Sequence, residues 1–318
     1  MTRILVTGAR GQLGSDLMAA AERAGVRATG LGSADLDITD AGAVDAALAA
    51  FADEAGPAGQ ESAAGGPAVV INSAAYTAVD AAEADPAAAL AINAKGAGNL
   101  AAAAAANGLS LIHLSTDYVF PGDATEPYQV DDPTGPRSVY GHTKLAGEQA
   151  VLAANPGAHV VRTAWVYGAS GSNFVKTMAA LAASRDTVSV VDDQHGSPTW
   201  SADLAAGLLE LAAVDAPGGV LHATGAGETT WCGLAKAVFS ELGADPARVL
   251  PITTEAFPRP APRPAYSVLS GRAWAQLGLT PLRHWRAALS MAFDAHRGEF
   301  APPPQRGERH RPNRIPIR

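Results

Sequence analysis

Tyr140 and Lys144 lie four positions apart in Val-Tyr-Gly-His-Thr-Lys, where a helix is predicted. Positions i and i+4 share one face of a helix, so the Lys144 ammonium can approach the Tyr140 phenol. A free phenol has a pKa of about 10 and is a poor acid at neutral pH, but a nearby cation lowers that pKa. The pair therefore predicts a catalytic proton donor. Because this spacing often arises by chance, an exposed helix face is the alternative for the pair on its own.

A glycine turn near the N-terminus gives the pair a context. A buried strand is predicted at 3–7 and an amphipathic helix from 15 to about 24. Between them the glycines follow G-x-x-G-x-x-G, which permits a tight turn and lets a pyrophosphate approach the helix N-terminus. A purely structural turn is the weaker alternative. The candidate cofactor contacts in this turn are Gly8, Arg10, Gly11, Gln12, Leu13 and Gly14.

Strands and helices alternate along the chain. Further strands are predicted at 26–31, 68–72, 110–115 and 159–163, and helices at 41–54, 86–107 (weakened near Gly96 and Gly98) and 140–154. This rhythm predicts an α/β fold with a Rossmann-type, doubly wound parallel sheet and a smaller C-terminal substrate lobe. Residues 1–170 are expected to form mainly the NAD(P)-binding domain, and 171–300 mainly the substrate lobe, interleaved with the last sheet strands. A flexible insertion is predicted at 56–66, and a disordered, basic, Pro-rich tail at 301–318.

Composition indicates an intracellular enzyme. The 318 residues carry a formal net charge of −8, which argues against a nucleic-acid partner. A single cysteine, Cys232, allows no intrachain disulfide and fits a reducing compartment. No signal peptide or membrane-spanning run is visible, so a cytoplasmic protein without a membrane partner is expected. The eight histidines show no ligand spacing, so no metal site is predicted, and His142 is expected at the surface. The oligomeric state is left open, with a homodimer as one option.

The end of the second predicted strand bears on the choice of cofactor. NAD-preferring Rossmann proteins carry an acid directly after this strand, which binds the adenosine ribose hydroxyls. Residues 30–33 are Gly-Leu-Gly-Ser, and the absence of an acid leaves room for a 2′-phosphate. Arg10 could pair with that phosphate, with a solvated loop residue as the alternative. NADPH is therefore the expected cofactor, and NADH is the alternative.

The glycine turn and the downstream Y-x-x-x-K together resemble the extended short-chain dehydrogenase/reductase superfamily. Asp37-Ile38 is similar to its D-[LIV] pair beside the adenine, although Asp37 could instead cap the next helix. The small residues after the third strand resemble its N-A-A motif, with Ser73 as a departure, and would let backbone approach the cofactor. A tightly packed strand end is the alternative there. The further candidate cofactor contacts are Ala74, Ala75, Thr77, Tyr140 and Lys144.

The stretch Ser-Thr-Asp-Tyr-Val-Phe at 115–120 follows a predicted strand, where open α/β sheets place their chemistry. It closely resembles the S-T-D-Y-V-F of the dTDP-4-dehydrorhamnose reductases. Further matches to that family lie at 74–80, 139–148, 162–167, 192–199 and 263–269, so the resemblance covers about residues 3–295. The glycine turn and Y-x-x-x-K indicate only the superfamily, whereas S-T-D-Y-V-F, W-V-Y and D-Q-x-G-x-P-T are much more specific.

The resemblance implies that NAD(P)H reduces the C4 ketone of dTDP-4-dehydro-L-rhamnose to give dTDP-L-rhamnose. Tyr140 would protonate the C4 oxygen, Lys144 would bind the nicotinamide ribose and lower the Tyr140 pKa, and Thr116 would bind the reacting oxygen. The alternatives are a strand-end cap for Asp117, a core side chain for Trp165 and a structural ion pair for Arg263. The implied substrate contacts are Thr116, Asp117, Trp165, Asn173, Gln194 and Arg263.

Other functions compete with this reductase. A nucleotide-sugar 4,6-dehydratase or 4-epimerase belongs to the same superfamily, but the dehydratases carry an Asp-Glu pair after the Thr, and here Tyr118 follows Asp117. A non-catalytic subunit, similar to the regulatory subunit of methionine adenosyltransferase, has no need of a catalytic set, whereas Thr116, Tyr140 and Lys144 are all present. Another nucleotide-sugar 4-ketoreductase also stays open, since the sequence does not settle the nucleobase or the sugar.

Overall fold

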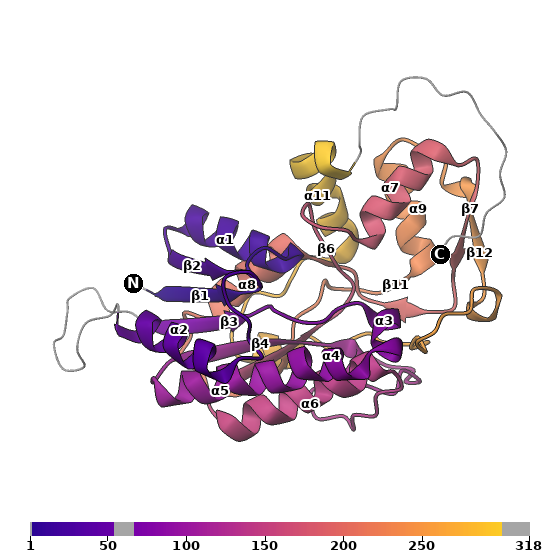
Figure 1. Cartoon of the computed structure of the whole chain (residues 1–318). Helices are drawn as coiled ribbons and strands as arrows, with labels where there is room; N and C mark the ends of the chain where they lie inside the picture. The colour runs from indigo at the N-terminus through magenta and orange to yellow at the C-terminus, as the bar shows by residue number, and fades with distance from the viewer. Residues whose placement is uncertain (1, 54–66, 301–318) are drawn as a thin grey trace.

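A parallel sheet of six strands forms the centre of the molecule (Figure 1). The structure is a computed structural model that describes residues 2–53 and 67–300, so the predicted insertion and the predicted tail lie outside the described residues. All neighbouring strands are parallel, in the order β10-β5-β4-β3-β1-β2. The strands are β1 (Arg3–Thr7), β2 (Arg27–Leu31), β3 (Ala68–Asn72), β4 (Ser110–Thr116), β5 (His159–Thr163) and β10 (Gly219–His222).

The direction in which strands are added reverses at β1, because β2 lies on one side of it and β3 on the other. Open α/β sheets bind ligands outside the carboxyl ends of their strands at such a reversal. The glycine turn follows β1, and Thr116 ends β4, two strands away at the same edge. The sheet thus confirms the predicted Rossmann-type architecture and brings the two predicted motifs to one edge.

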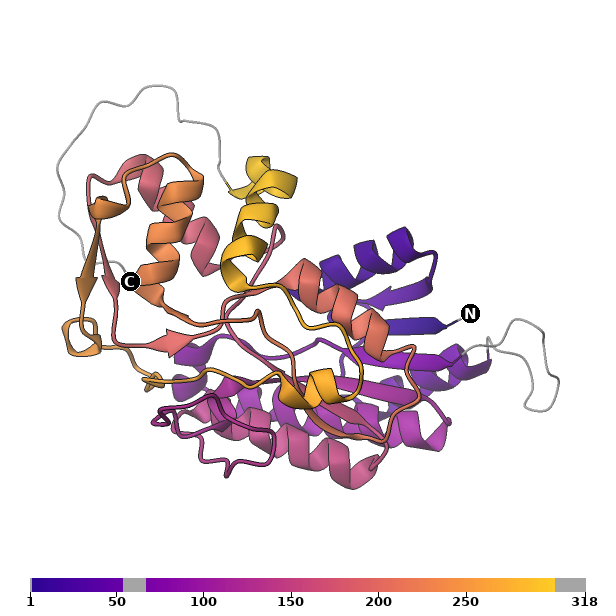
Figure 2. The same cartoon turned by 180° about the vertical axis from the view of Figure 1, so that it is seen from behind.

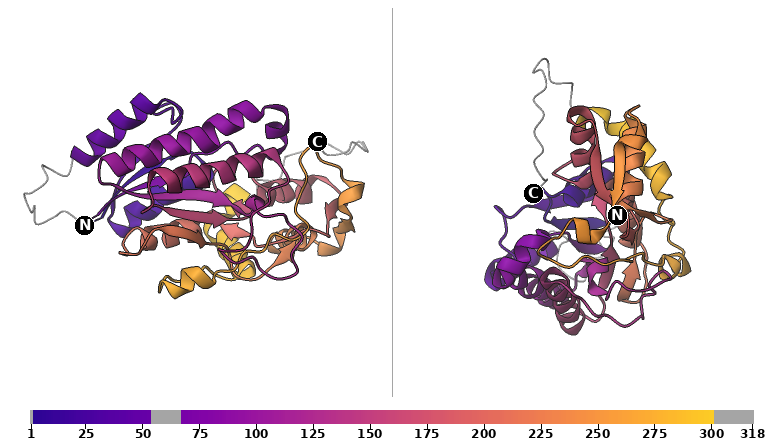
Figure 3. Two further views of the ribbon diagram at one scale, coloured as in Figure 1. Left: turned by 90° about the horizontal axis from the view of Figure 1, so that it is seen from below. Right: turned by 90° about the vertical axis from the view of Figure 1, so that its right-hand side faces the viewer.

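Helices cover both faces of the sheet. Helices α1 and α8 pack together over one face, and α2, α5 and α6 lie side by side over the other (Figure 3). Successive strand residues point to opposite faces, so Ile4 and Val6 face α1 whereas Leu5 faces the second layer. Burial on both faces accounts for the near-continuous apolar runs of the strands. The helices of the two layers are α1 (Gln12–Ala24), α2 (Ala41–Asp53), α5 (Ala97–Ala106), α6 (Val139–Ala154) and α8 (Ser201–Leu211). The short helices α3 (Val79–Ala84) and α4 (Pro86–Leu90) precede α5 in the chain.

A second group of elements has its own core beside the sheet. Helices α7, α9 and α11 pack with the parallel pair β7 and β12, and they bury Val175, Val238 and Phe293 among them. Figure 2 shows the chain between β12 and α11 returning along the main sheet to α10. This group and its connections comprise β6 (Val166–Tyr167), α7 (Phe174–Ser184), β7 (Val188–Val191), β8 (His195–Gly196), β9 (Thr199–Trp200), β11 (Thr229–Thr230), α9 (Trp231–Glu241), η3 (Pro246–Arg248), β12 (Val249–Ile252), η4 (Thr254–Ala256), α10 (Arg272–Gln276) and α11 (Trp285–Phe300).

Two helices differ from their predicted form. Helix α1 begins at Gln12, directly after the glycine turn, which closes with a 2.9 Å hydrogen bond from the Gly11 N–H to the Gly8 carbonyl. The predicted helix at 86–107 contains a π-helical turn, η1 (Ala91–Gly96), between α4 and α5. Such turns are frequent at functional sites. This one places Asn93 so that its amide bonds the Tyr76 N–H and the Thr143 hydroxyl, at 2.8 and 3.0 Å.

Within residues 2–53 and 67–300, the helices are too short or too polar to cross a bilayer.

Leu17 tests the packing of α1 on the sheet. Its side chain is fully buried in the core shared by α1 and α8. Leu17→Ala should lower the free energy of unfolding by about 2–5 kcal/mol, because the cavity adds to the lost transfer energy. Leu90→Ala is the control, because Leu90 is half exposed and should change stability by less than about 1 kcal/mol. Equal losses in denaturant titrations would contradict this account of the core.

Candidate active site

Helix α6 holds the Tyr–Lys pair against the end of β4. Tyr140 and Lys144 are both buried, on the face that packs on the sheet, and His142 is exposed, as predicted. Tyr140 lies beside Thr116, whose hydroxyl donates to Asp117 Oδ1 at 2.9 Å. The structure therefore brings the three predicted catalytic residues together at the carboxyl end of β4.

The acidity of Tyr140 differs from the expectation. Burial, aided by the Asp117 charge and opposed by Thr116, raises the pKa of Tyr140 to about 12. The net shift of the Tyr140 pKa is therefore upward, opposite to the lowering expected from Lys144, because burial is the largest effect on this phenol. Tyr140 therefore carries its proton at neutral pH, as a proton donor must, although the raised pKa makes it a weaker acid than a free phenol.

Lys144 is anchored to the sheet. Its Nζ donates to the Leu114 carbonyl at 2.6 Å. Burial lowers the pKa of Lys144 to about 8, against the opposing effect of the Glu148 carboxylate. Nearby His113 on β4 accepts from the Asn72 amide at 2.9 Å, and burial together with the Lys144 charge keeps its pKa well below 6.5. Because His113 is neutral, Lys144 is the charged side chain of this contact between α6 and β4.

The glycine turn forms a cradle against the end of β3. Gly8 has a φ of +70°, and a Cβ there would lie 2.7 Å from the Ala74 nitrogen. A Cβ on Gly14 would lie 2.2 Å from the Gly8 carbonyl oxygen. The N-terminus of α1 has no side-chain cap, so its N–H groups can meet an anion. Ala75 is half-buried beyond Ala74, and the last predicted contact of this segment, Thr77, is exposed.

Arg10 lies across the end of β2. A Cβ on Gly32 would touch the Arg10 side chain at 2.9 Å, and the Arg10 guanidinium bonds the Asp35 carboxylate at 3.1 Å. Asp35 also accepts from the Gly32 N–H at 2.8 Å. No acid directly follows β2 in the sequence, but the next turn brings the Asp35 carboxylate back to the end of this strand. The Arg10 side chain is 71% exposed, so its other nitrogens face solvent.

Asp37 and Ile38 lie on the next turn of the same edge. The Asp37 carboxylate accepts from the Thr39 N–H and hydroxyl at 2.9 and 2.8 Å, and these bonds lower its pKa. The cap of α2 is Asp40, so the capping role considered for Asp37 is wrong. Ile38 is buried against Gly96 of η1, where a Cβ would meet it at 2.7 Å.

Gln12 joins the glycine turn to the second group of elements. Its amide donates to the Val166 carbonyl and accepts from the Asn173 amide, each at 2.9 Å. Asn173 also caps α7 by accepting from the Lys176 N–H at 3.0 Å. Asn173 therefore lies beside the cofactor turn, and its contact with a substrate diphosphate stays a prediction. Leu13 packs, partly buried, against the core beneath α1.

Three predicted substrate contacts already have partners. Burial raises the pKa of Asp117 to about 6, against the lowering effect of the Ser267 and Thr116 hydroxyls. Arg263 forms a 3.0 Å ion pair with Asp80, which is the structural role considered for it as the alternative. Its guanidinium carbon also lies 6.0 Å from the centroid of the Tyr118 ring. The buried Gln194 bonds the Thr254 hydroxyl at 2.9 Å. Their binding of a nucleotide sugar stays a prediction.

Trp165 adopts a conformation that tryptophan rarely takes. Its φ is +48°, and its ring stacks on Trp231 with centroids 3.5 Å apart. A Cβ on Gly196 would lie 2.4 Å from the Trp165 ring, so only glycine fits behind it. Strained residues cluster at functional sites. Trp231 was not predicted as part of the site, because no motif or spacing in the sequence links position 231 with position 165.

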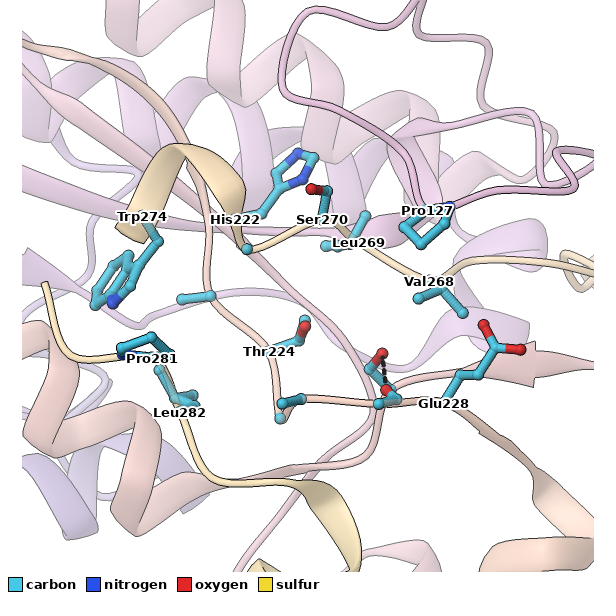
Figure 4. Close-up of a pocket in the computed structure, with 16 residues that line it drawn as sticks. Pro127, His222, Thr224, Glu228, Val268, Leu269, Ser270, Trp274, Pro281 and Leu282 are labelled. Atoms are coloured by element: carbon cyan, nitrogen blue, oxygen red, sulfur yellow. Dashed lines mark hydrogen bonds between the residues drawn. The ribbon is translucent and has the colours of Figure 1, made fainter. Parts of the chain in front are cut away.

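A cavity of about 350 Å³ lies away from these residues, between the end of β10 and the chain at 268–271 (Figure 4). It is lined by Thr224, Glu228, Trp274 and their neighbours, and none of the predicted catalytic residues lines it. Among the described residues, no group of three or more His, Cys, Asp or Glu side chains is placed to hold a metal ion.

The fold and the site together define a class of protein. A doubly wound parallel sheet with a glycine cradle at its reversal point, and a buried Tyr–Lys pair beside a threonine, define an extended short-chain dehydrogenase/reductase. The family model described as "RmlD substrate binding domain" matches residues 1–297. The chain belongs to this family, the dTDP-4-dehydrorhamnose reductases, and is an oxidoreductase.

Known relatives agree with that family. A dTDP-4-dehydrorhamnose reductase from Streptomyces griseus is 53% identical over 95% of this chain and 96% of its own. A probable dTDP-4,6-dihydroxy-2-methyloxan-3-one 4-ketoreductase from Streptomyces antibioticus is 48% identical over 96% of this chain and 99% of its own. The crystal structure of a dTDP-4-dehydrorhamnose reductase from Bacillus anthracis, in complex with NADP, superposes with a TM-score of 0.85 at 36% identity, covering 92% and 99% of the two chains.

Gly8→Ala tests the cradle. The added methyl group must displace backbone at Ala74, so the affinity for NADPH should fall at least tenfold, on the order of 1.4 kcal/mol. Gly25→Ala is the matched control, because Gly25 has a φ of +66° but no atom within 4 Å of its added Cβ. Both variants carry the same backbone strain. Equal NADPH affinities in fluorescence titrations would show that the cradle does not hold the cofactor.

Proposed function

We propose that this chain reduces the C4 ketone of dTDP-4-dehydro-L-rhamnose to give dTDP-L-rhamnose, with NADPH as the hydride donor and Tyr140 as the proton donor. The observation that carries the proposal is the buried contact of Tyr140 with Thr116 at the carboxyl end of β4. Tyr140 shares a small hydrophobic cluster with Tyr76, which lies two residues after Ala74, the neighbour of Gly8 in the glycine cradle. This short segment connects the cradle with the surroundings of the proton donor.

The cradle fits a dinucleotide. A pyrophosphate would bind the uncapped N–H groups of α1, with Gly8 and Gly14 leaving room for it. The adenine would lie beside Asp37 and Ile38, and the nicotinamide ribose beside Lys144. The nicotinamide would supply a hydride to C4. The NADP-bound Bacillus anthracis relative and the exposed Arg10 favour NADPH over NADH.

The protein side of the reaction is a proton transfer. Tyr140 is protonated at neutral pH, since its pKa of about 12, raised by burial, lies well above 7. As negative charge develops on the C4 oxygen, Tyr140 gives up the proton, and Thr116 offers a hydroxyl to the same oxygen. The Lys144 cation then stabilises the tyrosinate that remains. Asp117 and Trp165 would hold the sugar, with Arg263, Gln194 and Asn173 toward the nucleotide.

Another dTDP-sugar 4-ketoreductase activity is the second candidate. The Streptomyces antibioticus relative, named for a different dTDP-linked ketone, is only slightly less similar than the rhamnose enzyme from Streptomyces griseus. A dehydratase is disfavoured because Tyr118, half-buried and with a raised pKa, stands where a second carboxylate would act. Turnover of several dTDP-linked 4-keto sugars, compared by kcat/KM, distinguishes the two reductase assignments.

Tyr140→Phe tests the proton donor. The variant should lose about 10²–10⁴-fold in kcat, since the general acid is removed, while NADPH binding stays within about twofold. Turnover is followed by NADPH absorbance with dTDP-4-dehydro-L-rhamnose, and the sugar product is identified. His142→Gln, an exposed change on the same helix turn, should keep full activity. A fully active Tyr140→Phe would mean that the proton comes from another group.

Arg10→Ala and Asp35→Asn test the cofactor preference. Arg10→Ala removes the cation and exposes the Asp35 carboxylate, so the ratio of kcat/KM for NADPH to that for NADH should fall at least tenfold, which corresponds to about 1.4 kcal/mol. Asp35→Asn frees Arg10 from its partner and should raise the same ratio. If neither variant moved the ratio, the 2′-phosphate would lie elsewhere.

A further inference from the structure

Helix α6 carries a second buried charge, one turn beyond Lys144. Glu148 accepts from Arg162 of β5 in a two-point contact, with Nε to Oε1 at 2.9 Å and a terminal nitrogen to Oε2 at 2.8 Å. The two side chains are 4% and 5% exposed. Both residues belong to stretches that match the family, Glu148 to 139–148 and Arg162 to 162–167. Neither residue has a part in the reaction described above.

Arg162 links three parts of the molecule besides α6. Its guanidinium lies 4.9 Å from the centroid of the Phe120 ring, donates to the Val130 carbonyl at 3.3 Å, and lies 3.5 Å from His222 Nε2 on β10. Phe120 directly follows the short helix η2 (Asp117–Val119), which begins after Thr116. The ion pair therefore ties the helix of Tyr140 and Lys144 to the segment of Thr116 and Asp117.

Stability alone does not account for this pair. Removing two charges from water costs several kcal/mol per ion, and replacement of a buried ion pair by apolar side chains of similar size is often neutral or stabilising. A two-point contact does, however, fix the relative position of two elements more narrowly than apolar packing does. The surrounding contacts indicate which elements are fixed.

We propose that Glu148 and Arg162 are positioning residues of the reduction, whose ion pair holds α6 in the register that aligns Tyr140 and Lys144 with Thr116. The proposal rests on the proposed function for its catalytic consequence. Glu148 has a second effect, because its charge opposes the loss of the proton from Lys144 caused by burial.

Few other charges face Lys144. Helices α4 and α5, which pack on α6, contain no titratable side chain, and Lys95 of η1 is exposed. Glu83 of α3 binds the Val139 N–H at the far end of α6, and Asp80 pairs with Arg259 and Arg263. The remaining groups are His113 of β4, Arg162 of β5, Asp117 and Tyr118 of η2, and Tyr140 and Glu148 of α6 itself.

Glu148→Gln keeps the shape of the side chain and removes its charge. We expect kcat to fall about 10–100-fold, because small displacements of catalytic groups cost this much. The alkaline limb of the pH profile should move about one unit lower, since Lys144 loses the carboxylate that favours its charged form. Glu241→Gln, which breaks the Glu241–Arg286 pair of the second group of elements, is the matched control and should change neither quantity.

The double variant Glu148→Met/Arg162→Met separates positioning from stability. It should melt at or near the wild-type temperature yet keep the low kcat of Glu148→Gln. Wild-type kcat in the folded double variant, or an unchanged kcat and pH profile in Glu148→Gln, would overturn the proposal. If the double variant does not fold, Glu148→Gln decides alone.

The pH dependence of NADPH affinity gives a readout that does not need the sugar. Because Lys144 would contact the nicotinamide ribose, the alkaline loss of affinity should also move about one unit lower in Glu148→Gln. A wild-type protein that binds NADPH but turns over no dTDP-linked ketone would refute the proposed function. In that case, the pH dependence of NADPH binding would still test whether Glu148 supports the charge of Lys144. An unchanged pH dependence in Glu148→Gln would refute this effect of Glu148.

Discussion

The seat of helix α6 on the sheet is the contact on which the rest of the site depends. Two glycines allow the close contacts around it, because a Cβ on Gly141 would lie 2.3 Å from the Tyr118 carbonyl oxygen of η2 and one on Gly147 would lie 2.1 Å from the Asn93 carbonyl oxygen of η1. Beneath the helix, Lys144 is buried and its Nζ lies 2.6 Å from the Leu114 carbonyl of β4. A larger residue at position 141 would push α6 away from η2, which follows Thr116, and one at position 147 would push it away from η1.

Burial under α6 sets the protonation states of the site in opposite directions. The pKa of Tyr140 rises to about 12 and that of Lys144 falls to about 8, since desolvation penalises the charged form of each group. A phenol that starts protonated is what a reduction needs, because the reaction consumes a proton. The cost appears after the transfer, when a buried tyrosinate must be stabilised by the nearby ammonium. The depth at which α6 buries these side chains therefore sets the protonation states on which the reaction depends.

The sequence was most informative where a local rule applies. The glycine spacing, the i,i+4 pair and the alternation of strands and helices led to the sheet, the cradle and the Tyr140–Lys144 face, and the structure confirms that fold. Contacts between distant segments were beyond such rules. The turn that brings Asp35 back to Arg10, and the stacking of Trp231 on Trp165, depend on how separate elements pack. The Tyr140 pKa was predicted in the wrong direction because charge spacing can be counted along a helix, whereas depth of burial cannot.

The cofactor turn and the second group of elements are joined by direct contacts, not by the chain alone. Gln12 bonds both the Val166 carbonyl and Asn173, the cap of α7, while Trp165 stacks against the first residue of α9. A displacement of the second group would therefore pull on the glycine turn through Gln12. Conversely, a ligand that fixes the turn restricts the position of α7 and α9. These contacts join the turn after β1 to α7 and α9, so the cofactor turn and the second group of elements form one continuous framework.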